Sequence, residues 1–220
     1  MDHHDAPEQR RTTSRSLPIA FAMALALAHA LSLASPAHAG RITPPPVPAG
    51  IAVPDGVEPF FVGHAEGTQN YVCLPVGSEF GWVLYTPVAT LFDDSDKQLT
   101  THFFTPNPFE AGTVRPTWQH SRDTSTVWAK LGPPASSDPA YVAPGAVSWL
   151  LLDVVGSAAG PNGGSALTAA THIHRVNTTG GVKPATGCSA AENVGDAAIV
   201  PYTADYYFYR DATDDEDEGN

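Results

Sequence analysis

The chain has 220 residues, of which 42% are hydrophobic and 15% are charged, and its formal net charge is -12. This length fits one domain with a substantial hydrophobic core. The acidic balance argues against a nucleic-acid-binding protein, because phosphate contacts need a basic surface. The 19 Gly and 21 Pro predict many turns, without reaching the level of a disordered low-complexity chain.

Residues 1–39 have the pattern of a secretory signal peptide. A basic start precedes an apolar stretch rich in Ala and Leu at 17–34, and Ala37 and Ala39 then match the small-x-small cleavage rule. A membrane anchor is the weaker interpretation, because Ala drives insertion poorly and the cleavage site follows directly. We therefore expect secretion to the periplasm or the extracellular space, with cleavage between Ala39 and Gly40. No later segment is long and apolar enough to span a membrane.

Three segments are expected after the signal peptide. Residues 40–54 are rich in proline and predict an extended leader that lies along the domain or holds it away from the export machinery. Residues 55–210 show no internal repeat and no shift in composition, so we expect a single domain there. Residues 211–220 are dominated by Asp and Glu and predict a disordered, solvated tail.

The domain consists of short runs rich in Val, Thr, Tyr, Phe and Trp, separated by clusters of Gly, Pro, Asn and Asp. In chain order the runs are 60–62, 69–74, 82–85, 88–92, 99–104, 114–118, 124–131, 147–155, 167–176, 197–200 and 202–209. Residues 70–74 and 171–176 alternate with the period of two that is typical of strands. No stretch after residue 40 keeps a helical apolar period over three turns.

These patterns predict an all-β fold, a single-domain β-sandwich or barrel of about ten short strands with little helix. The most continuous apolar run, Trp149–Leu152, predicts a central strand that is buried on both faces.

The two cysteines of the chain, Cys73 and Cys188, both lie in the expected mature protein. In an oxidising compartment two cysteines without a third predict a disulfide. The bridge would be worth roughly 4–5 kcal/mol in the chain-entropy model, because it closes a long loop. A thiol nucleophile or a metal ligand is less favoured, since neither cysteine lies in a CxxC motif or a Cys/His cluster.

His172 and His174 are two residues apart on an expected strand, so their side chains point to the same face. Two neighbouring imidazoles are a common half of a Zn or Cu site, with His102 as the expected third ligand and His120 as another candidate. The other interpretation places both histidines on the solvent face of an edge strand. No Glu follows at the distance that the cupin pattern requires.

Other catalytic motifs are incomplete. Residues 120–123 contain His, Ser and Asp, but side chains so close in sequence cannot form a catalytic triad, and we expect an exposed turn there. The chain has no G-x-S-x-G motif, and the glycines of 150–164 do not match G-x-G-x-x-G, which excludes the dinucleotide-binding fingerprint.

Two interpretations fit the aromatic residues: a sugar-stacking platform on the surface, or packing in the core and along strand edges. Core packing is favoured, because Trp and Tyr suit strands in general. The residues concerned are Trp82, Trp118, Trp128, Trp149, Tyr202, Tyr206, Tyr207, Phe208 and Tyr209.

Several strings, taken together, resemble a known family. They are Gly67–Cys73 (GTQNYVC), His102-Phe103, Pro116–Trp118, Trp149–Leu152, Arg175–Cys188 (RVNTTGGVKPATGC) and Tyr202–Tyr209 (YTADYYFY). With them the chain resembles, over most of residues 55–209, the exported bacterial and fungal family known as domain of unknown function 3455. The resemblance implies export and a shared fold. Because the family has no established activity, the resemblance implies no catalytic residue.

Two functional hypotheses follow. The first is a non-enzymatic module of the envelope or the extracellular space, which binds a glycan or another surface ligand or serves as a surface protein without a small ligand. The second is a metal-binding protein or metal-dependent enzyme centred on His172 and His174. No nucleic-acid partner is expected, and a Zn or Cu ion is the only cofactor that the pattern indicates.

Overall fold

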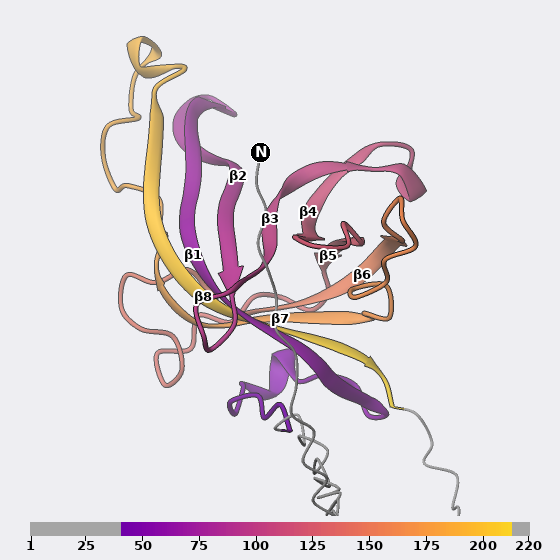
Figure 1. Ribbon diagram of the computed structural model, residues 1–220. Coiled ribbons are helices and arrows are strands. Elements are labelled where there is room, and N and C mark those ends of the chain that lie inside the picture. Colours follow the sequence, from indigo (N-terminus) through magenta and orange to yellow (C-terminus); the bar gives the residue numbers. More distant parts are fainter. Residues whose placement is uncertain (1–40, 213–220) are drawn as a thin grey trace, which may run out of the picture. The chain divides into compact units, whose positions relative to one another are not determined.

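Eight antiparallel strands close into a barrel, in which each strand pairs with the next one along the chain and β8 pairs back with β1 (Figure 1). The structure, a computed structural model, describes residues 41–212. The strands are β1 Val57–Val76, β2 Glu79–Phe92, β3 Gln98–Asn107, β4 Thr113–His120, β5 Thr126–Leu131, β6 Leu150–Ala158, β7 His172–Gly180 and β8 Ala197–Asp211. The all-β prediction is confirmed, as a barrel of eight strands instead of about ten.

Helical structure within residues 41–212 is limited to the short 3-10 segments η1 Ala49–Ile51, η2 Pro108–Glu110 and η3 Ala191–Asn193. No helix in this range is long and apolar enough to cross a membrane. The predicted signal peptide and the acidic residues from 213 onward lie outside the described residues. Asp211, the first residue of the expected tail, still pairs with Val57 at the end of β8.

Three strands are longer than expected, because each of them joins two of the apolar runs. β1 continues through Gly67, β2 through Pro87 and β8 through Pro201. A Cβ atom at Gly67 would collide with the backbone of Val88 and Ala89, so glycine there permits close approach of β1 and β2. Proline removes one N–H donor and fixes φ at about −65°, and the extended backbone of β2 and β8 continues through it.

The inner face of the barrel is filled by apolar side chains from every strand except β3, in the alternation of period two that strands impose. This inner cluster consists of Ala65, Ala89, Leu91, Trp118, Val127, Ala129, Leu152, Leu167, Ala170, Ile173, Tyr202, Ala204, Tyr206 and Phe208. Leu167 and Ala170 come from the loop between β6 and β7, so this loop plugs one end of the barrel.

A second cluster covers the outer face of β6, β7 and β8. It consists of Ile51, Val142, Trp149, Leu151, Val176, Tyr207 and Tyr209, with Ile42, Val47 and Val53 packed against it. The proline-rich leader therefore lies along the domain, which is one of its two expected positions (indigo in Figure 1). Leu151 faces this cluster and Leu152 faces the barrel interior, so the Trp149–Leu152 segment is buried on both faces, as predicted.

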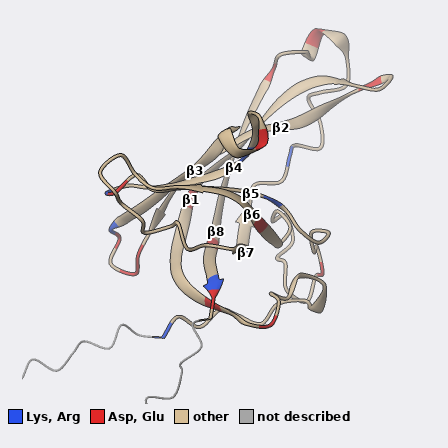
Figure 2. Ribbon diagram, turned by 90° about the vertical axis from the view of Figure 1, so that its right-hand side faces the viewer, with Lys and Arg blue, Asp and Glu red and all other residues tan. Residues whose placement is uncertain are grey.

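Acidic residues lie mostly at turns and strand ends, and basic residues are sparse along the ribbon (Figure 2). Among the described residues, the ion pairs between Arg and an acidic side chain are Arg115 with Glu110, 2.7 Å apart, and Arg210 with Glu58, 2.8 Å apart. Both pairs lie outside the barrel core, since all four side chains are partly exposed.

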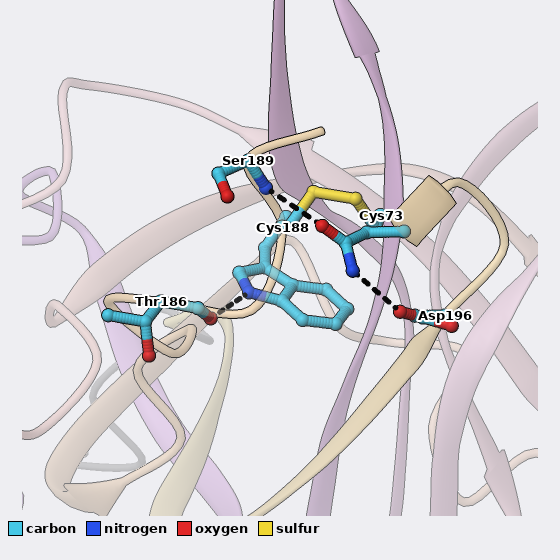
Figure 3. Close-up of a disulfide and its surroundings, with 7 residues drawn as sticks. Cys73, Thr186, Cys188, Ser189 and Asp196 are labelled. Carbon is cyan, nitrogen blue, oxygen red and sulfur yellow. Dashed lines mark hydrogen bonds between the residues drawn. A yellow bond between two sulfur atoms is a disulfide. The ribbon is translucent and has the colours of Figure 1, made fainter. Parts of the chain in front are cut away.

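The disulfide between Cys73 and Cys188 is present, as predicted (Figure 3). It ties residues 181–196, the loop between β7 and β8, to the part of β1 that extends past the barrel with β2 and β8 (Figure 1). Hydrogen bonds support the attachment: the Cys73 N–H donates to the Asp196 carbonyl at 2.9 Å, and Trp82 Nε1 donates to the Thr186 carbonyl at 2.9 Å.

Asp123 joins the turn between β4 and β5 to the plug loop. Its Oδ1 accepts hydrogen bonds from the backbone N–H and the hydroxyl of Ser125, and its Oδ2 accepts one from the Ala166 N–H at 2.8 Å. The Leu167 N–H in turn donates to the Ser125 hydroxyl. Residues 121–123 thus form the expected turn, with Ser121 and Arg122 exposed, whereas His120 ends β4 and Asp123 is partly buried, where it holds the plug residue Leu167 in place.

We expect Asp123→Asn to lower the free energy of unfolding by about 2 kcal/mol at pH 7. Burial raises the pKa of Asp123, but the hydrogen bonds from Ala166 and Ser125 outweigh that effect and lower it to about 2. Since the ordinary value is 3.8, the stabilisation is complete above that pH and is lost as the pH falls through about 2. Urea unfolding at pH 7 and pH 2.5 measures both changes.

The matched control is Asp138→Asn, at an exposed turn carboxylate that accepts one hydrogen bond, from the Ala140 N–H. This variant should change the unfolding free energy by less than about 0.5 kcal/mol. Equal effects of the two substitutions would show that the Asp123 contacts do not stabilise the plug.

Candidate ligand-binding site

A cavity of about 160 Å³ lies inside the barrel. Every strand except β5 contributes to its lining, which consists of Gln69, Leu84, Pro87, His102, Phe104, Pro116, Trp118, Leu150, Leu152, Arg175 and Tyr206. Eight-stranded barrels are just wide enough either to be filled by side chains or to hold one small ligand. A cavity of about 150 Å³ accommodates a benzene molecule, so this one has room for a single six-membered ring.

The cavity adjoins a depression of about 440 Å³ at the mouth of the barrel. Four residues line both spaces, namely Gln69, Leu84, Leu150 and Arg175. The rim of the depression is formed by the loop 132–149, which connects β5 and β6, and by Val182 and Lys183. The interior is therefore open to the surface on this side, at the end of the barrel that the plug loop does not close.

Two consecutive glycines shape this rim. Gly180 and Gly181 have φ angles of 58° and 79°, in the left-handed region that glycine adopts without strain. Their carbonyl oxygens accept hydrogen bonds from the Val147 N–H at 2.8 Å and the Tyr71 hydroxyl at 2.6 Å. The Thr178 hydroxyl donates to the Val147 carbonyl at 2.6 Å, so the loop 132–149 is fixed to β7 at several points.

His102 lines the cavity and is held in one neutral tautomer. Its ring stacks on Trp118, with centroids 4.1 Å apart, and its Nδ1 lies 2.9 Å from the Thr117 carbonyl oxygen. Because a carbonyl only accepts, Nδ1 carries the proton and Nε2 is left as an acceptor. Burial lowers the pKa of His102 to about 3, so the ring stays uncharged at neutral pH.

Two buried donors beside His102 have no partner within residues 41–212. They are Gln69 Nε2 and Trp118 Nε1, on side chains that are 2% and 1% exposed. A buried donor without a partner costs about 1–3 kcal/mol, and such groups are uncommon in folded proteins. Both residues line the cavity, so an acceptor group of a bound molecule is the natural partner for them.

Arg175 brings a positive charge to the junction of the two spaces. Its Nε and Nη2 donate to the Ser148 carbonyl oxygen at 3.2 and 2.8 Å, and no carboxylate of residues 41–212 forms a salt bridge with it. Nearby lie the Tyr202 and Tyr206 hydroxyls, 3.3 Å apart. Burial raises the pKa of both tyrosines, so both are protonated, and the charge of Arg175 is not neutralised.

The histidines proposed as metal ligands lie on different sides of the barrel wall. His172 and His174 share one face of β7, as expected, and it is the outer face, whereas His102 lines the cavity inside the barrel. His174 is 2% exposed under the leader, where Nε2 donates to the Ile51 carbonyl at 2.7 Å and Nδ1 accepts from the Tyr209 hydroxyl at 2.9 Å. Both ring nitrogens of His174 are thus already hydrogen-bonded.

His120, the other candidate ligand, lies 2.9 Å from the Asp123 carboxylate in the turn between β4 and β5. Within residues 41–212, no group of three or more His, Cys, Asp or Glu side chains is arranged to hold a metal ion. The structure therefore keeps His102, His120 and the His172–His174 pair apart.

The aromatic residues mainly fill the two clusters. Trp118, Tyr202, Tyr206 and Phe208 lie in the inner cluster, while Trp149, Tyr207 and Tyr209 lie in the outer one. Trp128 is 8% exposed, and Trp82 is half-buried against the loop 181–196. This arrangement agrees with core packing, which was the favoured of the two interpretations of the aromatic residues.

Sequence reasoning missed Gln69 and Arg175 as site residues. Arg175 could have been found from the alternation along the strand. The same period of two that puts His172 and His174 on one face puts Arg175 on the opposite face with Ile173, which is apolar and buried. A charged residue at an inward position of a buried strand is unusual enough to mark a site.

The fold and the site define a class of protein: a closed antiparallel barrel of eight strands with a cavity that opens at one mouth. Within that class the chain belongs to the family described as "Protein of unknown function (DUF3455)", whose model matches residues 54–210. Neither the curated proteins nor the solved structures include a significant match to the chain. The matched range covers all residues that line the cavity and the barrel up to Arg210, one residue before the end of β8.

Proposed function

We propose that the protein is an exported, non-enzymatic binding protein that holds one small ligand in the barrel cavity. The observation that carries the proposal is a ring-sized space joined to the surface and lined by buried donors without partners, Gln69 Nε2 and Trp118 Nε1. Up-and-down barrels of this size serve as ligand carriers in other proteins. The lining of the cavity suits recognition better than catalysis, because it contains no Ser, Thr, Cys, Asp or Glu side chain and because burial lowers the pKa of His102 to about 3, which makes it a weak base at neutral pH.

Two features support export as part of the proposal. Residues 1–39 carry the signal-peptide pattern, and the Cys73–Cys188 disulfide suits an oxidising compartment such as the periplasm or the extracellular space. We therefore place the binding function outside the cytoplasm. A glycan is one form that the ligand could take, and monosaccharides belong in the test for that reason.

Binding is tested by titrating the purified protein with phenol, benzamide, benzoate, glucose and galactose. We expect at least one single-ring compound to bind with a dissociation constant below about 1 mM and to raise the unfolding temperature, since a ligand of the folded state stabilises it. Isothermal titration calorimetry and thermal unfolding measure the two effects. If no member of the set binds, the proposal fails in favour of a surface protein without a small ligand.

A blocked variant shows where the ligand binds. Leu84 lines both spaces and is 38% exposed, so Leu84→Trp should obstruct the mouth and weaken binding at least tenfold without disturbing the core. The matched control is Val88→Trp on the same strand, at a position that is 52% exposed and lines neither space. Equal binding by the two variants would contradict binding in the cavity.

A further inference from the structure

We infer that the cavity takes an aromatic carboxylate of a single ring, with Arg175 as the residue that pairs with its charge. This inference rests on the proposed binding function and adds the chemical class of the ligand. The first argument is charge. Arg175 and Lys183 are the charged residues that line the cavity and the depression, and both are basic in a chain with a net charge of -12.

Arg175 has unused capacity to bind an anion. A charge that is partly removed from water is normally paired with an opposite charge. The guanidinium group instead donates from Nε and Nη2 to a neutral acceptor, the Ser148 carbonyl oxygen, and the Tyr206 hydroxyl beside it is also uncharged. Because Arg175 lines both spaces, a molecule that reaches the cavity through the depression passes this group.

The second argument is the shape and polarity of the inner cavity. Its walls beyond Arg175 are mostly apolar, formed by Pro87, Phe104, Pro116, Trp118 and Leu152. A volume of about 160 Å³ suits one ring and excludes larger ring systems. An anion without an apolar body would leave these walls uncovered, so inorganic phosphate and acetate use only part of the site.

The third argument is the unpartnered donor on Gln69. Its Nε2 is buried and lacks a partner, and the residue lines the same two spaces as Arg175. A carboxylate offers about four acceptor positions and can receive hydrogen bonds from two residues at once. A neutral acceptor such as an amide can satisfy the Gln69 donor but leaves the charge of Arg175 unpaired, so we expect the carboxylate charge to add affinity beyond the hydrogen bonds.

The experiment compares benzoate with benzamide, which has nearly the same shape and no charge, by calorimetry on the purified protein at low salt. We expect benzoate to bind at least tenfold more tightly than benzamide, acetate or inorganic phosphate. Arg175→Gln should weaken benzoate binding at least tenfold and leave benzamide binding within about twofold. The control is Lys130→Gln, which removes an exposed positive charge on β5 outside the site and should change neither affinity.

The outcomes separate the two proposals. If no compound of the titrated set binds to the unmodified protein, the binding function fails and the ligand class with it. If other members of the set bind but benzoate does not, only the carboxylate inference is overturned. If benzamide binds as tightly as benzoate, or if Arg175→Gln leaves their ratio unchanged, the carboxylate inference is overturned while the binding function stands. If phosphate or acetate binds as tightly as benzoate, the site recognises a simple anion and the aromatic part of the inference is overturned.

Discussion

Replacing both Cys73 and Cys188 with alanine is expected to lower the free energy of unfolding by about 4–5 kcal/mol. The bridge joins residues 115 positions apart, so its loss returns a large amount of conformational freedom to the unfolded chain. Both sulfur-bearing side chains are buried, at 0% and 9% exposure. Urea unfolding followed by circular dichroism measures the loss.

The substitution should also loosen the mouth of the barrel. Val182 and Lys183 on its rim belong to the loop that the disulfide holds, together with the Trp82–Thr186 hydrogen bond. Amide hydrogen exchange in residues 181–196 should therefore accelerate more than exchange in the plug loop. Ser189→Ala, an exposed change beside Cys188, is the control and should leave the protein unaltered. The same urea midpoint for both proteins would contradict the stabilising role of the bridge.

Local sequence patterns predict the strands but not how the sheet closes. Alternation of period two and turn residues give the all-β class, and Gly67, Pro87 and Pro201 divide three long strands into six apparent runs. Closure depends on the pairing of β1 with β8, from the two ends of the domain. No short-range signal encodes that pairing, so a sandwich and a barrel are equally compatible with the sequence.

The site was predictable in part, for a related reason. Alternation along β7 assigns His172 and His174 to one face and Arg175 to the other, but it does not say which face points inward. Which face of β7 points inward depends on what packs against the outer face, and in this protein the proline-rich leader packs there. Proline content predicts an extended leader, whereas its docking is set by the apolar residues Ile51 and Val47 between the prolines.

Replacing Ile51 with alanine is expected to lower the free energy of unfolding by about 3 kcal/mol. Ile51 is fully buried in the outer cluster, packed with Trp149, Leu151 and Tyr209, and its removal leaves a cavity under the leader. Ala52→Ser, at the exposed neighbouring position, is the control and should change stability by less than about 0.5 kcal/mol. If the leader were an independent appendage, both variants would unfold at the same urea concentration.

The pKa of His174 depends on the same packing of the leader against the outer face of the barrel. Burial lowers the pKa of His174 from its ordinary value of 6.5, although the hydrogen bond to the Ile51 carbonyl opposes that effect and the neighbouring His172 adds to it. In the unfolded chain the His174 ring is therefore protonated below about pH 6.5, whereas in the folded protein it stays neutral to a lower pH. The free energy of unfolding thus falls as the pH drops below that value. Ile51→Ala should loosen the cover, raise the pKa of His174 and reduce this loss. An NMR titration of the His174 ring measures the shift, and identical titrations in the two proteins would mean that the leader does not shield it.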